Sequence, residues 1–328
     1  MSNTVVGLML IDAPHSALNN AGSDAGDRTD NIVRVKTIRK GMIRYPYVSG
    51  QALRYWWRET LENKFEWDMS PISRKDKIAF TSANPIDYPD DDMFGYMRAL
   101  NKKDGGTVTR ISPLKNSPLI AVVGQNPTED FGVMSRHEGD PVPYEHEFYS
   151  NVLKGIFSID LGCVGVFSEI EKTGYKNMSK DLLKLAEERK LIHEEDKWIM
   201  DKDSRIKRTQ DVINALPYLH GGAKSALHLT DVTPKIIVLA AIDGGNHIFM
   251  NIVREEKGNV VFDLDALDEV ISDYSDIIKS DIFIGIRTGF LKDTQNKIME
   301  YAENKNNIHV GTIKEMTDKF SNEIPKLI

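Results

Sequence analysis

Basic side chains gather in one part of the chain, where they could bind phosphate. The segment from Asn31 to Arg58 contains no Asp or Glu and has seven basic residues: Arg34, Lys36, Arg39, Lys40, Arg44, Arg54 and Arg58. Guanidinium and ammonium groups form charge-assisted hydrogen bonds with phosphate oxygens. A charge run is more often a solvated face, but seven basic residues without one acid favour a surface for a nucleic-acid backbone.

The net charge of the whole chain conceals this segment. The 328 residues include 42 Lys and Arg against 49 Asp and Glu, a net charge of −7. Outside the segment, the other 300 residues carry 35 basic and 49 acidic side chains, a net charge of −14. The sum therefore excludes only a uniformly basic coat protein, and the acidic remainder limits non-specific binding.

Two strands and a helix are expected to position the basic residues. Residues 32–40 and 42–47 alternate in part between polar and apolar side chains around a Lys40-Gly41 turn, which predicts a hairpin. Ser49 is a candidate N-cap for a helix over residues 51–63, whose N-terminal N–H groups could hold a phosphate. The buried stripe of this helix is Leu53, Trp56, Trp57, Thr60 and Leu61. This stripe favours core packing over base stacking for at least one of the two tryptophans.

Three further segments carry basic residues. The stretch from Arg98 to Lys115 has five basic residues against Asp104, and residues 205–208 open a helical pattern that is interpreted as a solvated face. Gly221 and Gly222 follow that helix and precede Lys224. Two glycines in this place favour a helix C-cap, and the alternative is close approach of a phosphate backbone.

Most catalytic signatures are missing. Cys163 is the single cysteine, which excludes an internal disulfide, and the eight histidines show no metal-binding spacing. Residues 145–147 (Glu-His-Glu) are interpreted as a mobile polar loop rather than a metal site. Asp27 and Asp30 are interpreted as turn-forming acids, with a catalytic carboxylate as the alternative. We expect no cofactor and no metal.

The chain shows no sign of a membrane or secretory segment. Its longest apolar run, Ile236 to Ile242, is far shorter than a membrane span, and residues 1–11 lack the basic region of a secretory signal. The sequence therefore predicts a reduced, cytoplasmic protein without a membrane partner.

The remaining elements are predicted from periodicity. The expected strands and helices are a buried strand over 4–11 ended by Pro14, a long strand over 148–170, a helix from Ser179 to about Leu191, a helix from Asp203 or Ser204, a hairpin of 234–242 with 247–253, and helix, strand and helix over 265–279, 281–291 and 292–305.

The segment Tyr45–Leu61, with two strands before a Ser-Gly-x-x-Leu helix start, resembles the CRISPR-associated RAMP superfamily. Within it, the chain resembles the backbone subunit of Cascade (CRISPR-associated family seven) in its DevR-like, type I-B-like branch. Weaker matches follow in order at Leu18-Asn19-Asn20, Val35-Lys36, residues 92–97, residues 147–150 and Gly221-Gly222.

The resemblance implies an α+β fold: a modified RRM or ferredoxin-like palm with an antiparallel sheet and large insertions. The whole chain 1–328 would be one domain. Residues 64–124 would form fingers, 125–147 a thumb, and 255–328 a C-terminal α/β extension of the palm.

The resemblance also implies a function. Such subunits are not nucleases; they bind CRISPR RNA (crRNA), assemble head-to-tail in a filament, and present the guide to target DNA in antiviral defence. Partners would be copies of the chain and the large, small, 5′-handle-binding and crRNA-processing subunits. The residues that would contact RNA are Asn19, Asn20, Arg34, Lys36, Arg39, Ser49, Gln51, Arg54, Arg58, Arg110, Lys115, Gly221, Gly222 and Lys224.

Two alternatives remain open. One is an RNA-cleaving backbone subunit of an RNA-targeting CRISPR complex, a metal-dependent endoribonuclease in which Asp27 or Asp30 supplies the carboxylate. The other is a DNA-binding transcriptional regulator, for which no helix-turn-helix pattern is present.

Overall fold

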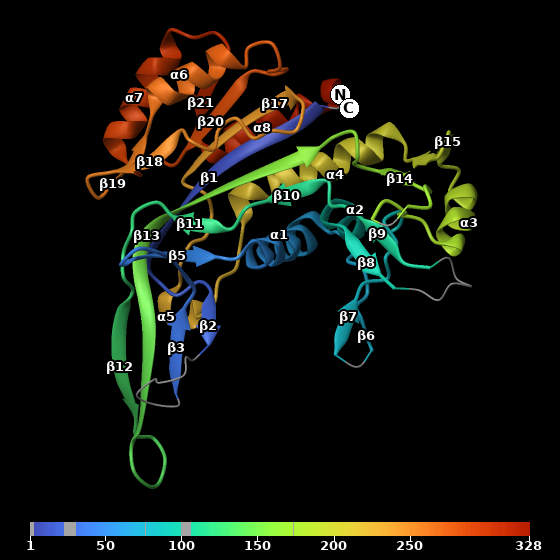
Figure 1. Cartoon of the computed structure of the whole chain (residues 1–328). Coiled ribbons are helices and arrows are strands. Elements are labelled where there is room, and N and C mark those ends of the chain that lie inside the picture. The colour runs from blue at the N-terminus through green and yellow to red at the C-terminus, as the bar shows by residue number, and fades with distance from the viewer. Residues whose placement is uncertain (1–2, 23–30, 76, 100–105, 173) are drawn as a thin grey trace.

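The computed structural model describes residues 3–22, 31–75, 77–99, 106–172 and 174–328. A large, mainly antiparallel sheet forms the centre of the molecule, and a long β-hairpin extends away from it (Figure 1). Helices pack against the sheet, so the fold is α+β, as the sequence predicted.

The central sheet has the topology of a ferredoxin-like or RRM palm. Its strands in spatial order are β21 (Ile308–Gly311), β20 (Ile282–Ile286), β17 (Ile236–Asp243), β1 (Asn3–Ser16), β13 (Val142–Asp160), β11 (Leu119–Ala121), β5 (Ile43–Val48) and β4 (Thr37–Lys40), with β10 (Leu114–Asn116) also paired to β13. Along the chain, β1, α1 (Gly50–Phe65), β10 and β11, β13, α4 (Lys202–Asn214) and β17 follow a βαββαβ order. The last of these strands lies beside β1, and β13 lies between β1 and β11, which is the ferredoxin-like arrangement.

Helices α1 and α4 bury the main core. Trp56 and Trp57 of α1 are buried, as predicted, so neither offers a face for a base. The Trp57 indole N–H donates to the carbonyl of Val212 at 2.9 Å. Its ring lies edge-on to Phe157 of β13, with ring centroids 5.2 Å apart. This contact ties both helices to the central strand.

The C-terminal part of the chain forms a second core with β1, β17 and β20. Its remaining elements are β18 (Val253–Glu256), β19 (Asn259–Phe262), α6 (Leu264–Asp273), α7 (Lys292–Glu303), α8 (Ile313–Ser321) and α9 (Ile324–Leu327). β20 and β21 extend the palm sheet, and their mutual pairing is parallel. Helix α8 packs on the α1–α4 side, where Ile313, Met316 and Phe320 join the main core.

The protruding hairpin consists of β12 (Thr128–Met134) and the first half of β13. β3 (Ile32–Val35) pairs with the other edge of β13, and β2 (Asn20–Gly22) pairs with β3. Residues 145–147 therefore lie in a central strand, and their interpretation as a mobile loop is wrong. The hairpin projects from the palm near β2 and β3 (Figure 1).

Between α1 and β10 the chain forms a separate lobe around a buried carboxylate. Its elements are β6 (Ser73–Lys75), β7 (Ile78–Phe80), α2 (Pro89–Phe94), β8 (Tyr96–Arg98) and β9 (Val108–Arg110). Asp92 has no exposed surface, pairs with Arg110, and accepts from Arg208 Nη1 at 2.6 Å. Arg208 is itself buried, so the interpretation of residues 205–208 as a solvated face is wrong at this position. After β13 the chain forms β14 (Val166–Ser168), α3 (Lys180–Glu188), β15 (Ile192–Glu194) and β16 (Lys197–Ile199), and after α4 the 3₁₀ turn η2 (Leu216–Tyr218) and α5 (Ser225–His228).

Several elements differ from the prediction. The long strand predicted over 148–170 is wrong, because β13 runs from Val142 to Asp160 and Val166–Ser168 form the separate strand β14, which pairs with β16. β1 continues past Pro14 because a register shift between Ala13 and Ser16 accommodates a residue without an N–H. Residues 247–253 do not pair with β17, since β1 and β20 already occupy both of its edges. Helix α4 begins at Lys202, before the predicted Asp203 or Ser204, because the Asp201 side chain caps it by accepting from the Ser204 N–H at 2.8 Å.

Candidate nucleic-acid interface

Asn19 connects the segments that the sequence singled out. Its Oδ1 accepts the backbone N–H of Ser49 at 2.9 Å, and its carbonyl accepts the N–H of Lys36 at 2.9 Å. The neighbouring carbonyl of Leu18 accepts the N–H of Ala223 at 3.0 Å. These bonds bring together, in one region of the palm, the backbone at Lys36 between β3 and β4, the N-terminus of α1 and the Gly221–Lys224 loop.

A basic cavity of about 410 Å³ lies where β3, β4 and β5 meet the hairpin. It is lined by Ala21, Arg34, Val35, Lys36, Thr37, Arg39, Arg44, Tyr47 and Glu147. Three of the predicted RNA-binding residues, Arg34, Lys36 and Arg39, are among them. No protein partner holds the side chains of Lys36 and Arg39 within the described part of the chain, so both cations are available to a phosphate.

Glu147 organises this cavity, and the sequence did not identify it. Its carboxylate is 3% exposed and accepts from Arg34 at 3.2 Å, Arg44 at 3.1 Å and the N–H of Val35 at 2.9 Å. A buried carboxylate with these partners is compensated, and it orients the two guanidinium groups. The signal in the sequence was its place in a Glu-His-Glu alternation, which puts it on the opposite face of β13 from His146.

A second cavity of about 730 Å³ adjoins the N-terminus of α1. Ser49, Gln51, Arg54, Arg58 and Lys115, all predicted to bind RNA, line it. Ser49 is the N-cap, as predicted, and its hydroxyl accepts the N–H of Ala52 at 3.3 Å. The partial positive charge of the helix start adds to the exposed Lys115 ammonium group.

Arg54 is a structural residue. Its guanidinium donates to the Leu114 carbonyl at 2.9 Å, to Ser112 Oγ at 3.0 Å and to the Phe94 carbonyl. Burial, together with the positive charge of Arg58, lowers the pKa of Arg54 to about 10. The predicted role of Arg54 as a phosphate contact is therefore corrected: its donors hold α1 to β10 and α2.

Arg58 lies deeper in the same cavity. Its guanidinium carbon is 4.1 Å from the centroid of the Phe94 ring. Burial lowers the pKa of Arg58, while the charges of Asp90 and Asp91 oppose this shift. Arg58 is thus held against the lobe of α2, with only part of its surface facing the cavity.

Arg110 lies away from the surface. It is 4% exposed, and its donors meet Asp92, the Cys163 carbonyl at 2.7 Å and the Val166 carbonyl at 2.9 Å. The prediction that Arg110 contacts RNA is corrected, because all of its N–H groups face protein acceptors.

Gly221 and Gly222 serve close packing, and the helix C-cap prediction is wrong because α4 ends at Asn214. Both glycines have positive φ, +151° and +106°. A Cβ on Gly221 would lie 2.2 Å from the Trp56 ring, and one on Gly222 would lie 2.7 Å from Leu18. The loop therefore presses against α1 and the Asn19 segment, and Lys224 follows it at the surface.

The other predicted residues are accounted for as follows. Asn20 pairs with Val35 across β2 and β3. Asp27 and Asp30 lie outside the described residues. Within the residues that the structure describes, no group of three or more His, Cys, Asp or Glu side chains could hold a metal ion. No helix in the described ranges is long and apolar enough to cross a membrane.

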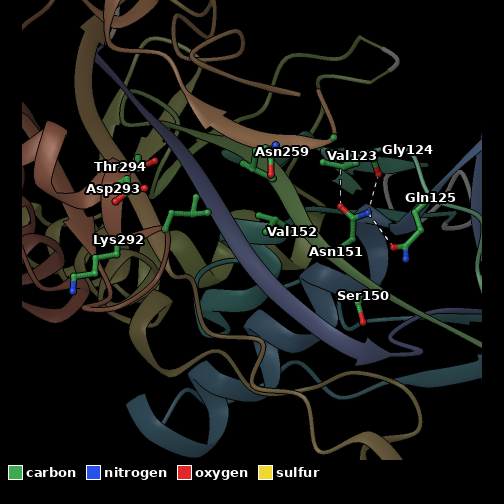
Figure 2. A pocket seen from close by; sticks show the side chains of 13 residues that line it. Val123, Gly124, Gln125, Ser150, Asn151, Val152, Asn259, Lys292, Asp293 and Thr294 are labelled. Atoms are coloured by element: carbon green, nitrogen blue, oxygen red, sulfur yellow. Dashed lines mark hydrogen bonds between the residues drawn. The ribbon is translucent and has the colours of Figure 1, made fainter. Parts of the chain in front are cut away.

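A further cavity, of about 690 Å³, lies between the palm and the C-terminal part (Figure 2). Its lining is mostly neutral, and the charged residues Lys292 and Asp293 oppose each other in sign. The Asn151 amide on its floor donates to the Val123 carbonyl at 2.8 Å. The charge of this cavity gives it no preference for phosphate, so the basic surface is the better candidate.

Comparison with solved structures shows a similar fold. A chain of a "CRISPR RNA-guided surveillance complex" matches with a TM-score of 0.52 at 11% identity, covering 97% of this chain and 98% of that chain. A chain of a "CRISPR RNA-guided surveillance complex, pre-nicking" matches with a TM-score of 0.56 at 12% identity, covering 98% and 100%. No curated protein matches in sequence.

Comparison with family models adds the sequence relationship. The model described as "CRISPR-associated negative auto-regulator DevR/Csa2" matches residues 11–257, which is well over half of the chain. It spans Asn19, both basic cavities, the protruding hairpin and the Gly221–Lys224 loop. The chain belongs to the DevR/Csa2 family of CRISPR-associated proteins.

Proposed function

We propose that the chain is a non-catalytic subunit that binds the backbone of a guide RNA in a CRISPR effector complex. The observation that carries the proposal is the junction at Asn19, which joins the backbone at Lys36 between β3 and β4, the start of α1 and the loop before Lys224. These segments surround cavities rich in Arg and Lys in a chain whose net charge is −7. Local concentration of positive charge in an acidic protein favours one defined path for a polyanion.

Phosphate contacts suit a guide-binding subunit. They position a nucleic acid without reading its sequence, so one protein can accept any guide. Sequence recognition then falls to pairing between the guide and target DNA. We further propose that copies of the chain bind along one crRNA in a head-to-tail filament together with the other subunits of the complex. A head-to-tail contact does not close on itself, so it produces a filament.

Lys36 and Arg39 provide the sharpest test, since neither side chain supports the fold through a protein contact in the described residues. The double variant Lys36→Gln/Arg39→Gln should bind single-stranded RNA more weakly than the wild type does, whatever the sequence of the RNA. The slope of log affinity against log salt should fall by about 0.7 for each lost phosphate contact. Substitution of Arg54 is unsuitable, because it would release α1 from its carbonyl partners.

The matched control is Lys180→Gln/Lys184→Gln, which removes the same charge from exposed positions on α3. It should retain the affinity and most of the salt slope of the wild type. If both double variants bind like the wild type, or if the wild-type chain binds no RNA, the proposal fails.

The cleavage alternative rests on Asp27 and Asp30, outside the described residues, and is tested by incubation with a complementary RNA and Mg²⁺.

A further inference from the structure

Five aromatic rings form a continuous row at the root of the protruding hairpin. Tyr144, His146 and Phe148 project from one face of β13, with centroids 6.1 Å apart for the first pair and 6.5 Å for the second. His15 of β1 continues the row at 6.3 Å from Phe148. His228 of α5 lies 6.2 Å from both His146 and Phe148. This face is opposite to the one that carries Glu147, because neighbouring residues in a strand alternate.

Unusual backbone geometry holds the row in place. The register shift in β1 turns His15 toward Phe148, and His15 has a φ of +47°. The N–H of His15 donates to Ser150 Oγ at 3.0 Å. The hydroxyls of Ser16 and Thr230 are 2.7 Å apart, which fixes the end of α5 to β1. Strained residues of this kind persist where surrounding contacts determine them, and they cluster at functional sites.

Two histidines in the row have ring nitrogens that make no hydrogen bond to the described residues. His146 Nδ1 and His228 Nε2 are buried ring nitrogens without a partner in the described residues. The charged groups that face them are Asp130, whose Oδ2 is 3.4 Å from His146 Nε2, together with Lys224 and His15 beside His228. Leu227 and Leu229 flank His228 and are 66% and 88% exposed. A surface of rings, exposed leucines and one lysine offers a nucleotide both an apolar face and a phosphate contact.

We infer that His146, Phe148 and His228 form a platform on which one unstacked base of a single-stranded RNA rests, with Lys224 holding the adjacent phosphate. The inference rests on the proposed function and adds a second kind of contact to it. Single-stranded RNA is bound by stacking its bases on aromatic side chains, including histidine, and stacking tolerates every base. The platform therefore suits a guide of variable sequence.

Protonation is coupled to this contact. Burial, followed by the charge of His146 and Lys224, lowers the pKa of His228, so its ring is neutral at neutral pH. A bound phosphate favours the imidazolium form and raises that pKa. RNA binding then takes up a proton, so affinity increases as the pH falls through the raised pKa of His228 in the bound state. The variant His228→Gln should lose this increase.

The direct test places 2-aminopurine at one position after another in a single-stranded RNA and measures its fluorescence on the full chain. At least one position should respond in the wild type, and the response should be lost in His146→Gln/His228→Gln. The affinity of that variant should fall about tenfold, as expected for one stacked base. The control is His193→Gln on β15, which removes a ring that stacks on Trp198 with ring centroids 4.3 Å apart. This variant should bind RNA like the wild type.

An abasic nucleotide at the responsive position keeps the test independent of variant folding. It should weaken binding to the wild type about tenfold and have no added effect on the double variant. Equal weakening of both proteins, or a response that survives both substitutions, would overturn the platform. If the platform signal is present while Lys36→Gln/Arg39→Gln binds like the wild type, the proposed phosphate surface fails and the platform stands. Absence of any RNA binding by the wild type overturns both.

Discussion

Asn19 Oδ1 accepts the backbone N–H of Ser49 at 2.9 Å, across 30 residues of chain. Ser49 is the N-cap of α1, so one amide side chain from the connection between β1 and β2 sets the position of the helix start. The carbonyl of the same residue holds the N–H of Lys36. Asn19 thus couples the basic cavity at β3 and β4 with the cavity at α1.

Removal of the Asn19 side chain should weaken both folding and RNA binding. Asn19→Ala leaves the Ser49 N–H without its acceptor, which should lower the free energy of unfolding by about 1–3 kcal/mol. Urea denaturation followed by circular dichroism measures this change. RNA affinity should fall under conditions where the variant is folded, because the start of α1 shifts relative to Lys36. Ser179→Ala is the control: it removes the N-cap of α3, costs about 1 kcal/mol and leaves RNA affinity unchanged. Equal loss of RNA affinity in both variants would contradict a specific role for Asn19.

The glycine loop should tolerate no side chain. Gly221→Ala places a Cβ against the Trp56 ring at a φ of +151°, so it should destabilise the protein by more than about 1 kcal/mol. Thermal unfolding reports the effect. Gly245→Ala is matched in chemistry, but nothing lies within 4 Å of the added Cβ, so its stability should stay within about 1 kcal/mol of the wild type. A neutral Gly221→Ala would show that the loop can move away from α1.

The buried ion pairs of Asp92 should dominate the stability of the α2 lobe. Asp92→Asn leaves Arg110 and Arg208 buried without a charged partner, so the free energy of unfolding should fall by about 3–5 kcal/mol. The comparison is Asp318→Asn, which breaks an exposed pair with Lys314 on α8 and should cost no more than about 0.5 kcal/mol. Urea titration of the two variants measures the difference. Similar midpoints would mean that the buried pairs contribute little.

Cys163 should react slowly with alkylating reagents until the solution is strongly alkaline. Desolvation by the neighbouring chain, followed by the negative charge of Asp160, raises the pKa of this thiol to about 11. The Sγ donates to Asp160 Oδ2 at 3.3 Å, which also favours the protonated form. Because the thiolate is the nucleophile, the rate should still be rising with pH at about pH 10.

Asp160→Asn should lower the pKa of Cys163 and increase its alkylation rate at about pH 8. A rate that levels off near pH 8.5, the ordinary thiol range, would contradict this environment. Cys163 is the only cysteine, so labelling reports one site.

Local patterns were sufficient for the elements whose causes are local. The Ser49 cap, the buried stripe of α1, the Lys40-Gly41 turn and the Ser179 cap of α3 all depend on residues within a few positions of each other. The resemblance in residues 45–61 supplied the family, and the family model confirms it. The same local reasoning failed at residues 247–253, because the neighbours of β17 are distant in the chain.

The sequence by itself determined that basic residues are concentrated between Asn31 and Arg58 and that the last two of them lie on a capped amphipathic helix. Only the tertiary structure decided which of those cations face outward. Arg54 belongs to the same basic segment as Lys36, yet its N–H groups donate to the carbonyls of Leu114 and Phe94. Arg110, from the second basic stretch, is likewise buried against the Asp92 carboxylate. Side chains alternate along β13, so Glu147 and Phe148 project from opposite faces of the hairpin. Glu147 therefore contacts β3, whereas Phe148 contacts His228 of α5. Long-range pairing assigns such roles, since a side chain's partners depend on which strands meet rather than on its neighbours in sequence.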